Sequence, residues 1–359
     1  MPAGKPTLAR AEAFARAYGL ELPILLAPMA GACPPSLSIA VASAGGLGAC
    51  GALLMQPAAI KAWASEVRAG TNGGFQINLW IPDPAPDRDA AAEDAVCAFL
   101  KSWGPEVPRE AGDAKPPDFS AQCEAMLEAT PTIISSIMGL YPANFVERMK
   151  AKRIKWFANV TTVSEARAAE AAGADAIVAQ GMEAGGHRGA FDAGKAESAM
   201  VGLFALVPAA VDAVRVPVIA AGGIADGRSL AAALLLGASA AQVGTGFLRS
   251  PEAQLPKAWA DALGGAAPED TLVTRAFSGR AGRSLATPYA RAAGRPDAPR
   301  PAPYPVQRGL TQAMREAAVR GGDIATMQAW AGQSAGRAAA KPAAEIAREL
   351  WEGARTLLG

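Results

Sequence analysis

Short apolar runs of β-like composition alternate with alanine-rich helical runs, and this alternation constrains the fold more than any other feature of the chain. It predicts eight strands, at residues 24–27, 48–51, 75–79, 132–135, 156–160, 176–180, 218–220 and 240–243. It predicts eight helices beside them, at residues 35–44, 57–69, 89–103, 121–129, 144–151, 164–172, 198–214 and 227–236. Apolar strands that alternate with amphipathic helices are typical of a parallel sheet covered by helices.

Eight such units predict an α/β fold: a closed (β/α)8 TIM barrel with a smaller added domain. A doubly wound open sheet is the alternative, although no GxGxxG motif follows the first strand, which argues against a dinucleotide-binding fold. Residues 1–255 are expected to form the barrel. Residues 256–305 look loop-like and arginine-rich, and are expected to form an added segment near the active-site mouth. Residues 306–359 are expected to return to the barrel as helices.

Composition limits the possible partners of the chain. Of its 359 residues, 34 are Lys or Arg and 33 are Asp or Glu, so the net charge of +1 offers no basic face to nucleic acid. Hydrophobic residues make up 51%, which is too many for a disordered chain. Residues 34–60 and 229–248 are long and uncharged, but glycines interrupt both. We therefore expect buried helices, turns and strands there, and no membrane span.

The cysteine pattern points to a reducing compartment. Cys33, Cys50, Cys97 and Cys123 form no CxxC pair, and the chain has one histidine, so no zinc site or other metal site is expected. The first residues lack the apolar core of a signal peptide. A cytoplasmic protein is therefore predicted, either a monomer or a homodimer.

Two glycine-containing turns follow the last two predicted strands. Gly222 and Gly223 come after the seventh strand, and Gly244 and Thr245 come after the eighth. Glycines let backbone N–H groups approach an anion, and the start of a following helix favours negative charge. The active site of a barrel enzyme lies at the carboxyl ends of its strands. We therefore expect these two turns to bind a phosphate-bearing ligand.

His187 stands in a glycine-rich run, residues 180–189, after the sixth predicted strand. Imidazole is well suited to acid–base chemistry near neutral pH, so His187 is the candidate catalytic residue, as a base or as a hydrogen-bond donor to an anion. Asn78 ends a buried strand, where an unpaired amide is costly, and is expected to bond a ligand. Glu183 is expected either to orient His187 or to cap the loop. Arg188 could attract an anionic substrate, but we expect it to be solvated at the surface.

Five motifs together resemble the nitronate monooxygenase family, formerly called 2-nitropropane dioxygenases. They are Leu-Ala-Pro-Met-Ala-Gly at 26–31, Ala-Gly-Gly-Leu-Gly at 44–48, Gln-Gly-Met-Glu-Ala-Gly-Gly-His-Arg-Gly at 180–189, Ala-Gly-Gly-Ile-Ala-Asp-Gly at 221–227 and Gln-Val-Gly-Thr at 242–245. Their order and spacing match over roughly residues 20–250, and Trp-Ala-Gly-Gln at 330–333 is similar in style. The run around His187 is the most specific motif, because the glycine motifs occur in many FMN barrels.

The resemblance implies an FMN-dependent enzyme, a flavoprotein that oxidises alkyl nitronates of the propionate 3-nitronate type with O2. It implies that His187 is the active-site base or the hydrogen-bond partner of the nitronate. The FMN contacts that it implies are Pro28, Met29, Ala30, Gly31, Asn78, Gln180, Gly185, Gly222, Gly223, Gln242, Val243, Gly244 and Thr245. The chain departs from the family at Ala32 and Cys33, so these two are left out, and Cys33 is expected to be a buried thiol.

Three other functions stay open. The nearest is an NAD(P)H-dependent FMN reductase of the same fold that acts on quinones or enoyl thioesters, because such enzymes also carry Gly-His loops. The second is a barrel lyase or isomerase that acts on a phosphorylated metabolite without flavin. The third is a flavin-binding protein without turnover. Visible flavin absorbance separates the flavin functions from the lyase.

Overall fold

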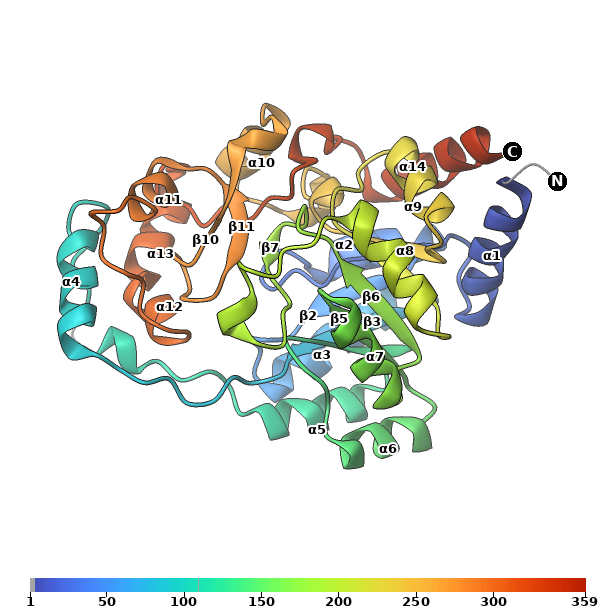
Figure 1. Ribbon diagram of the computed structural model, residues 1–359, viewed down its shortest axis with the longest axis horizontal. Helices are drawn as coiled ribbons and strands as arrows, with labels where there is room; N and C mark the ends of the chain where they lie inside the picture. The colour runs from blue at the N-terminus through green and yellow to red at the C-terminus, as the bar shows by residue number, and fades with distance from the viewer. Residues whose placement is uncertain (1–3, 109) are drawn as a thin grey trace.

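The computed structural model describes residues 4–108 and 110–359, and over these residues eight parallel strands form one sheet (Figure 1). They are β1 (Ile24–Leu26), β2 (Gly48–Gly51), β3 (Phe75–Trp80), β4 (Ile133–Ile137), β5 (Lys155–Val160), β6 (Ala176–Gln180), β8 (Val218–Ala221) and β9 (Ala240–Val243). Their order in the sheet is β1-β9-β8-β6-β5-β4-β3-β2, and a parallel bridge from Leu25 to Leu47 brings the two edges together. The predicted (β/α)8 barrel is confirmed.

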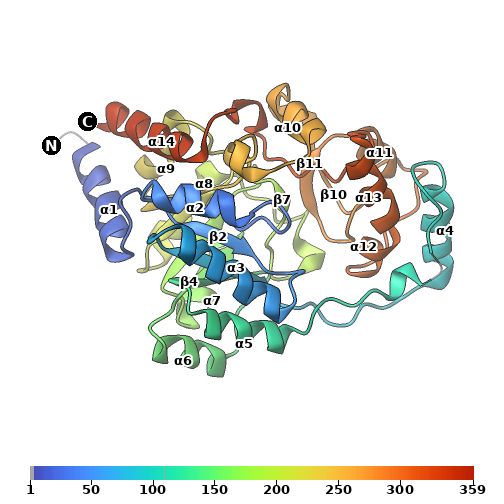
Figure 2. The same cartoon turned by 180° about the vertical axis from the view of Figure 1, so that it is seen from behind.

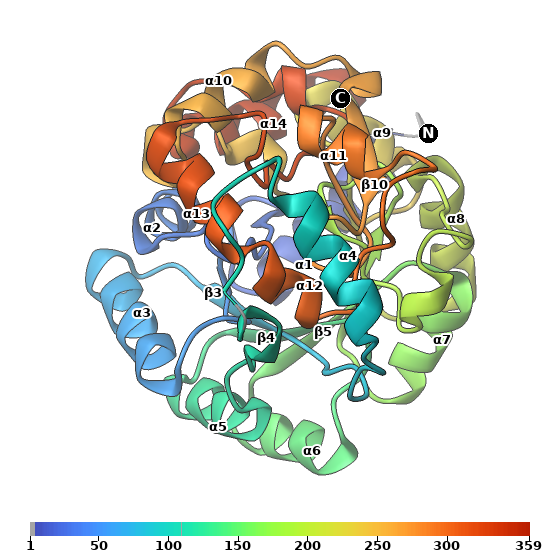
Figure 3. The same cartoon turned by 90° about the vertical axis from the view of Figure 1, so that its left-hand side faces the viewer.

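A ring of helices covers the outside of this barrel, as Figure 3 shows in a view toward one end of it. The helices of the ring are α2 (Pro35–Ser43), α3 (Pro57–Gly70), α5 (Phe119–Ala129), α6 (Ala143–Ala151), α7 (Val163–Ala171), α8 (Leu203–Ala213), α9 (Gly227–Leu235) and α14 (Ala343–Leu358). Helix α7 begins one residue before the predicted range 164–172, because Thr162 caps it by accepting a hydrogen bond from the N–H of Glu165.

The amino-terminal helix α1 (Gly4–Ala17) lies at the end of the barrel away from the added elements (Figure 1). Phe14 of this helix and the following Tyr18 pack against Phe157 of β5, with the Tyr18 and Phe157 rings 4.9 Å apart. These rings belong to the cluster of side chains that fills the barrel interior. This end of the barrel is therefore filled by side chains among the residues that the structure describes.

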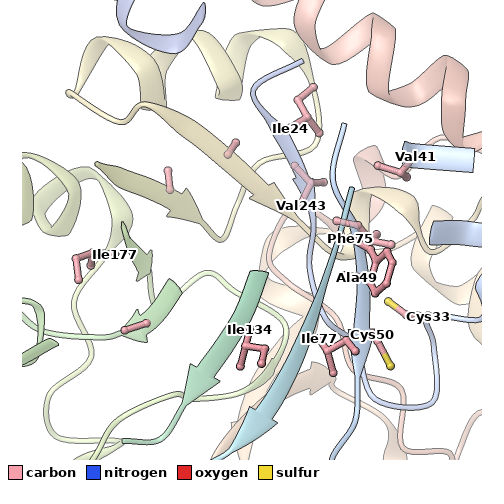
Figure 4. Close-up of a cluster of buried hydrophobic side chains, with 14 of the residues drawn as sticks. Ile24, Cys33, Val41, Ala49, Cys50, Phe75, Ile77, Ile134, Ile177 and Val243 are labelled. Atoms are coloured by element: carbon pink, nitrogen blue, oxygen red, sulfur yellow. The ribbon is translucent and has the colours of Figure 1, made fainter. Parts of the chain in front are cut away.

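The largest hydrophobic cluster lies between the strands and the surrounding helices (Figure 4). Successive side chains of a strand point to opposite faces, so each strand feeds both the interior and the outer layer. In β9, Ala241 and Val243 join the outer cluster, while Ala240 joins the interior one. Figure 4 shows Val243 in the outer cluster together with Ile24 and Phe75. The apolar runs that predicted the strands are continuous because both faces are buried.

A second group of elements stands over one end of the barrel (Figures 1 and 2). It comprises α4 (Ala90–Leu100), α10 (Lys257–Gly264), β10 (Thr271–Thr274), β11 (Gly282–Leu285), α11 (Pro288–Ala293), α12 (Val306–Leu310) and α13 (Gln312–Gly321). We call these elements the cap. A core of its own holds the cap together, built from Val96 and Leu100 of α4, Phe277, Tyr289 of α11 and Met314 of α13.

One strand joins the cap to the barrel. β7 (Gly186–His187), which follows β6 of the barrel, pairs antiparallel with β11, and β11 pairs in turn with β10. The sequence suggests loop-like structure for this part of 256–305, and the two cap strands are a difference from that expectation. The composition of these strands does not identify them in the sequence, because β11 reads Gly-Arg-Ser-Leu and its partner β7 lies in a glycine-rich run.

After the cap the chain returns to the barrel, where α14 packs against α9 and α2. The division of the chain at residues 255 and 305 stays a prediction. The cap core contains α4, which precedes residue 255, and α12 and α13, which follow residue 305. Within the described residues, no helix is both long and apolar enough to cross a membrane.

Candidate active site

A cavity of about 640 Å³ opens at the carboxyl ends of the barrel strands, beneath the cap. Its walls come from the loops after β1, β2, β6, β8 and β9, from strand ends, and from α12, α13 and residues 327–334. Of the residues that the sequence assigns to catalysis or to FMN, all but Val243 line it: His187, Pro28, Met29, Ala30, Gly31, Asn78, Gln180, Gly185, Gly222, Gly223, Gln242, Gly244 and Thr245. The fold thus brings together residues from distant parts of the chain.

Val243 is the residue that does not reach the cavity. It follows Gln242 in β9, so its side chain points to the opposite face of the strand, where it is 1% exposed in the outer core (Figure 4). The side chain of Val243 therefore lies away from the cavity, and the expected cofactor contact stays a prediction that concerns its backbone. The alternation of side chains along a strand distinguishes Gln242, which faces the cavity, from Val243, which faces away. The family motif includes both residues and does not distinguish them.

The loop after β1 is held by a thiol. Cys33 donates its S–H to the carbonyl of Ala27, 3.2 Å away, and its sulfur accepts the N–H of Met29 at 3.4 Å. Burial raises the pKa of Cys33 to about 12, so the group is a neutral thiol and not a nucleophile. Gly51 makes room for the same loop, because a Cβ there would lie 2.6 Å from the N of Ala30.

Amide side chains form the polar floor of the cavity. Gln180 holds the following loop at both ends of its amide: Nε2 donates to the carbonyl of His187 at 3.0 Å, and Oε1 accepts the N–H of Gly189 at 2.8 Å. Asn78 donates to the hydroxyl of Ser135 at 3.1 Å, and Gln242 accepts from Gln76 at 3.1 Å. These contacts hold each amide in a fixed orientation within the barrel.

Asn159 of β5 also lines the cavity, and the sequence did not single it out. Its amide Nδ2 is buried and has no hydrogen-bond partner among the described residues. A buried amide without a partner is costly. Like Asn78 and Gln180, Asn159 is thus a polar side chain near the carboxyl end of a barrel strand. An amide at that position of a predicted parallel strand is the sequence signal that could have identified it.

The two glycine turns leave backbone donors free. The N–H groups of Gly223, Thr245 and Gly246 make no hydrogen bond within the described part of the chain, and all three residues line the cavity. Gly222 and Gly223 have φ of +117° and +68°, a region that favours glycine. The segment after the cap fixes both turns: Ser334 donates to the carbonyl of Gly223 at 2.7 Å, and Thr245 accepts the N–H of Gly332 at 3.0 Å.

His187 lies where the barrel meets the cap. Its backbone pairs with Gly282 of β11, and its Nε2 lies 2.7 Å from the hydroxyl of Ser278, a fully buried residue of the cap. Two indoles flank the imidazole edge to face, with ring centroids at 4.6 Å for Trp80 and 4.7 Å for Trp330. These contacts leave Nδ1 as the ring nitrogen with no partner among the described residues.

Burial, together with the nearby charges of Arg280, Arg308 and Arg315, lowers the pKa of His187 to about 3. The imidazole is therefore neutral throughout the physiological range. The same arginines make the surroundings of His187 electropositive. An anion that enters the cavity is favoured by this potential, whereas a second cation is not.

Glu183 and Arg188 turn out to hold the loop in place. The Glu183 carboxylate accepts the N–H of Leu203 at 2.9 and 3.0 Å, so it caps the start of α8 and does not contact His187. Arg188 is 6% exposed and donates to the carbonyl of Gln180 at 2.7 Å. The expectation of a solvated Arg188 is therefore wrong. Its guanidinium is directed inward, where it donates to backbone carbonyls of three separate segments, those of Gln180, Thr161 and Ala199.

Several residues of the site could not be anticipated from the sequence. Ser278, Arg308 and Arg315 lie in or after a segment without a clear pattern, and Trp80 directly follows the predicted strand 75–79. Trp330 belongs to the Trp-Ala-Gly-Gln run, and that run was the available signal. No cluster of three or more potential metal ligands occurs among residues 4–108 and 110–359.

Comparison with known proteins relates this cavity to a family. The sequence model of a family described as nitronate monooxygenase matches residues 13–353. A protein of Paraburkholderia phytofirmans named nitronate monooxygenase is 40% identical over 338 residues, which cover 92% of each chain. Among solved structures, nitroalkane oxidase from Streptomyces ansochromogenes superposes with a TM-score of 0.85 at 35% identity, over 97% of this chain and 100% of the other. FabK from Thermotoga maritima gives 0.76 at 30% identity, over 96% of each.

Proposed function

Because the chain belongs to the nitronate monooxygenase family, we propose that it oxidises alkyl nitronates of the propionate 3-nitronate type with O2, that it uses FMN, and that His187 contacts the substrate. One observation carries the proposal. A neutral imidazole, held between two indoles, lines the same cavity as two glycine turns with free N–H groups. The cavity thus combines a place for a phosphate with a place for a small anion.

The residues present fit FMN. The unpaired N–H groups of Gly223, Thr245 and Gly246 suit its phosphate, since backbone donors in a glycine turn bind anions. A side chain would close this cradle: a Cβ on Gly222 would lie 3.0 Å from the N of Ala184, and one on Gly244 3.3 Å from the sulfur of Met29. When bound, FMN would supply the electron acceptor for the nitronate and, once reduced, the donor to O2.

The residues that would hold FMN line the cavity from several strands. We assign them as Pro28, Met29, Ala30, Gly31, Asn78, Gln180, Gly185, Gly222, Gly223, Gln242, Gly244 and Thr245. The glycine turns would take the phosphate, and the fixed amides would meet the polar edge of a planar ring. The apolar loop after β1 would exclude water from that ring.

Ser278 fixes the proton of His187. Its hydroxyl carries one proton and can donate it to the carbonyl of Arg280, 3.2 Å away, while the N–H of Arg280 donates back to the oxygen at 3.3 Å. In that arrangement the hydroxyl oxygen accepts Nε2–H of His187 at 2.7 Å. Nδ1 then keeps its lone pair and is the nitrogen that can take a proton from a neutral nitroalkane.

The low pKa of His187 makes the anionic nitronate the better substrate. Burial and nearby arginines disfavour the imidazolium, so taking a proton from carbon is difficult. A nitronate has already lost that proton and is attracted by the same arginines. We therefore assign nitronates as the main substrates and neutral nitroalkanes as slow ones.

Anaerobic mixing tests the proposal. The FMN-loaded enzyme is mixed with propionate 3-nitronate or with NADPH, and the visible absorbance of the flavin is followed. We expect the nitronate to bleach or shift the flavin spectrum quickly and NADPH to leave it unchanged. Rapid bleaching by NADPH with no response to the nitronate would replace the proposal by the NAD(P)H-dependent reductase. A protein that shows no flavin absorbance after loading with FMN would exclude both.

His187→Asn tests the role of the imidazole. We expect the variant to keep FMN and to lose about 100-fold of the kcat/KM for nitroethane, which needs a base. Oxidation of the preformed ethyl nitronate should fall much less, because that substrate needs no deprotonation. The ratio of the two activities, measured by oxygen consumption, is the readout. Unchanged turnover of nitroethane would remove His187 from the mechanism.

A further inference from the structure

Two arginines in the cavity wall lack a counter-charge. Arg308 of α12 and Arg315 of α13 line the cavity, as do Glu316 and Arg320. Glu316 and Arg320 are exposed and lie 3.8 Å apart as an ion pair. Among the charged residues described in this wall, Arg308 and Arg315 therefore remain without a carboxylate at ion-pair distance.

Arg315 is held by neutral acceptors, and Arg308 by none. Arg315 donates to the hydroxyl of Thr311 at 3.1 Å, to the carbonyl of Arg308 at 2.8 Å and to Oε1 of Gln328 at 3.5 Å. The guanidinium of Arg308 donates to no group in the described part of the chain, although it has five N–H donors and is half-buried. A cation withdrawn from water without a partner is costly, which points to a ligand as the missing acceptor.

A second unpaired donor lies on the same wall. Nε2 of Gln328 is buried and has no hydrogen-bond partner, while Oε1 of the same amide accepts from Arg315. Gln328 lines the cavity with Arg308 and Arg315. The three side chains therefore present free donors and two positive charges to one region of the cavity.

This region belongs to the same site as His187. Arg308 and Arg315 both act on the imidazole electrostatically, since both lower its pKa. Their helices come from the cap, whereas the two glycine turns come from the barrel loops after β8 and β9. The cavity thus has a cationic wall in addition to the phosphate cradle assigned above.

We propose that Arg308 determines substrate specificity by binding a carboxylate that the nitronate carries at the far end of its carbon chain. The proposal rests on the function proposed above. Two arginines without an ion-paired carboxylate match a substrate with two negative charges, one on the nitronate and one on a carboxylate. The planar guanidinium binds a carboxylate through two parallel hydrogen bonds. Arg315 holds the backbone of Arg308 and adds the second charge.

Two nitronates of equal chain length test the inference. Propionate 3-nitronate and propyl-1-nitronate differ in having a carboxylate or a methyl group at the end away from the nitronate. With FMN-loaded enzyme, we expect Arg308→Met to lower kcat/KM for propionate 3-nitronate about 30-fold, mainly through KM, since hydrogen bonds to charged groups are lost. Its kcat/KM for propyl-1-nitronate should change by less than about twofold.

Matched variants separate the explanations. Arg308→Lys keeps the positive charge but cannot form the two parallel hydrogen bonds of a guanidinium. It should therefore lose less kcat/KM for propionate 3-nitronate than Arg308→Met does. Arg295→Met removes an exposed arginine that follows α11, pairs with Asp297 and does not line the cavity, and should alter neither substrate. An equal loss on both nitronates would overturn the inference, because Arg308 would then act on the nitronate or on the fold. So would an unchanged preference, or a weaker binding of FMN by Arg308→Met in a fluorescence titration.

An unreactive pair of acids gives a readout without turnover. Succinate carries a carboxylate at both ends, and butyrate carries one. We expect succinate to inhibit the wild-type enzyme more strongly than butyrate, and Arg308→Met to abolish the difference. If both acids inhibit the wild type equally, the second anionic subsite does not exist. If the wild type oxidises neither nitronate, the function itself fails, whatever the acids do.

Discussion

His187 shows how surroundings set the chemistry of one side chain. The fold withdraws the imidazole from water, places two indoles against it and surrounds it with arginines, so its pKa falls to about 3. An imidazole free in the unfolded chain titrates near 6.5. The folded protein therefore binds fewer protons than the unfolded chain between these two values. Stability must fall as the pH falls through this window, and the loss is absent above it.

His187→Asn should remove this pH dependence. Between pH 7 and pH 5, we expect the free energy of unfolding of the wild type to drop by about 2 kcal/mol relative to the variant. This is the effect of an imidazole that becomes protonated in the unfolded chain and stays neutral in the folded protein. Urea unfolding of both proteins at pH 5, 6 and 7 measures the difference, and all other titrating groups cancel. Parallel curves for the two proteins would mean that His187 is protonated in the folded state near its ordinary pKa.

At the scale of elements, the barrel strands could be predicted and the cap strands could not. Predicted and observed boundaries of the eight barrel strands differ by at most two residues, because strands buried on both faces are continuous apolar runs. β10 and β11 carry polar residues, and β7 has two residues, so none of them forms an apolar run in the sequence. These strands are identified by their hydrogen-bonded pairing in the structure. The cavity residues on barrel loops could likewise be predicted, whereas Ser278, Arg308 and Arg315 come from the cap.

The loop between β6 and β7 depends on a close backbone approach. A Cβ on Gly185 would lie 2.5 Å from the N of Gly332 and 2.7 Å from the carbonyl carbon of Ala331, both backbone atoms that cannot rotate away. Gly185→Ala should therefore separate the loop from the segment after the cap. We expect a destabilisation of about 2 kcal/mol together with weaker binding of FMN.

Gly265→Ala is the matched control for Gly185→Ala. Gly265 follows α10, has a negative φ of −100°, and a Cβ there would meet nothing within 4 Å. Chemical unfolding and FMN titration of the two variants measure the contrast. A Gly185→Ala protein that behaves like Gly265→Ala would show that the two segments move apart freely.

For the whole molecule, the question is what keeps the cap over the barrel. Arg280 of the cap donates to both carboxylate oxygens of Asp83 at 2.8 Å, and to the carbonyl of Ala190 at 2.7 Å, so it joins two barrel loops. Arg280 is 2% exposed and the Asp83 side chain 23% exposed. The N–H of Arg188 adds a backbone bond to the carbonyl of Ala281 at 2.9 Å. A pair this buried is hard to lose, because removing one partner leaves the other charge away from water.

Arg280→Met should therefore cost about 3 kcal/mol in the free energy of unfolding, because it strands the Asp83 carboxylate and the Ala190 carbonyl. Arg148→Met is the control: Arg148 pairs with Glu124 on the surface, where both are exposed, and its loss should leave unfolding unchanged. Adding Asp83→Leu to Arg280→Met should restore part of the stability, since no unpaired charge then remains. Urea unfolding midpoints of the four proteins decide the matter. If Arg280→Met is as stable as Arg148→Met, contacts other than this ion pair hold the cap, and the ion pair contributes nothing measurable.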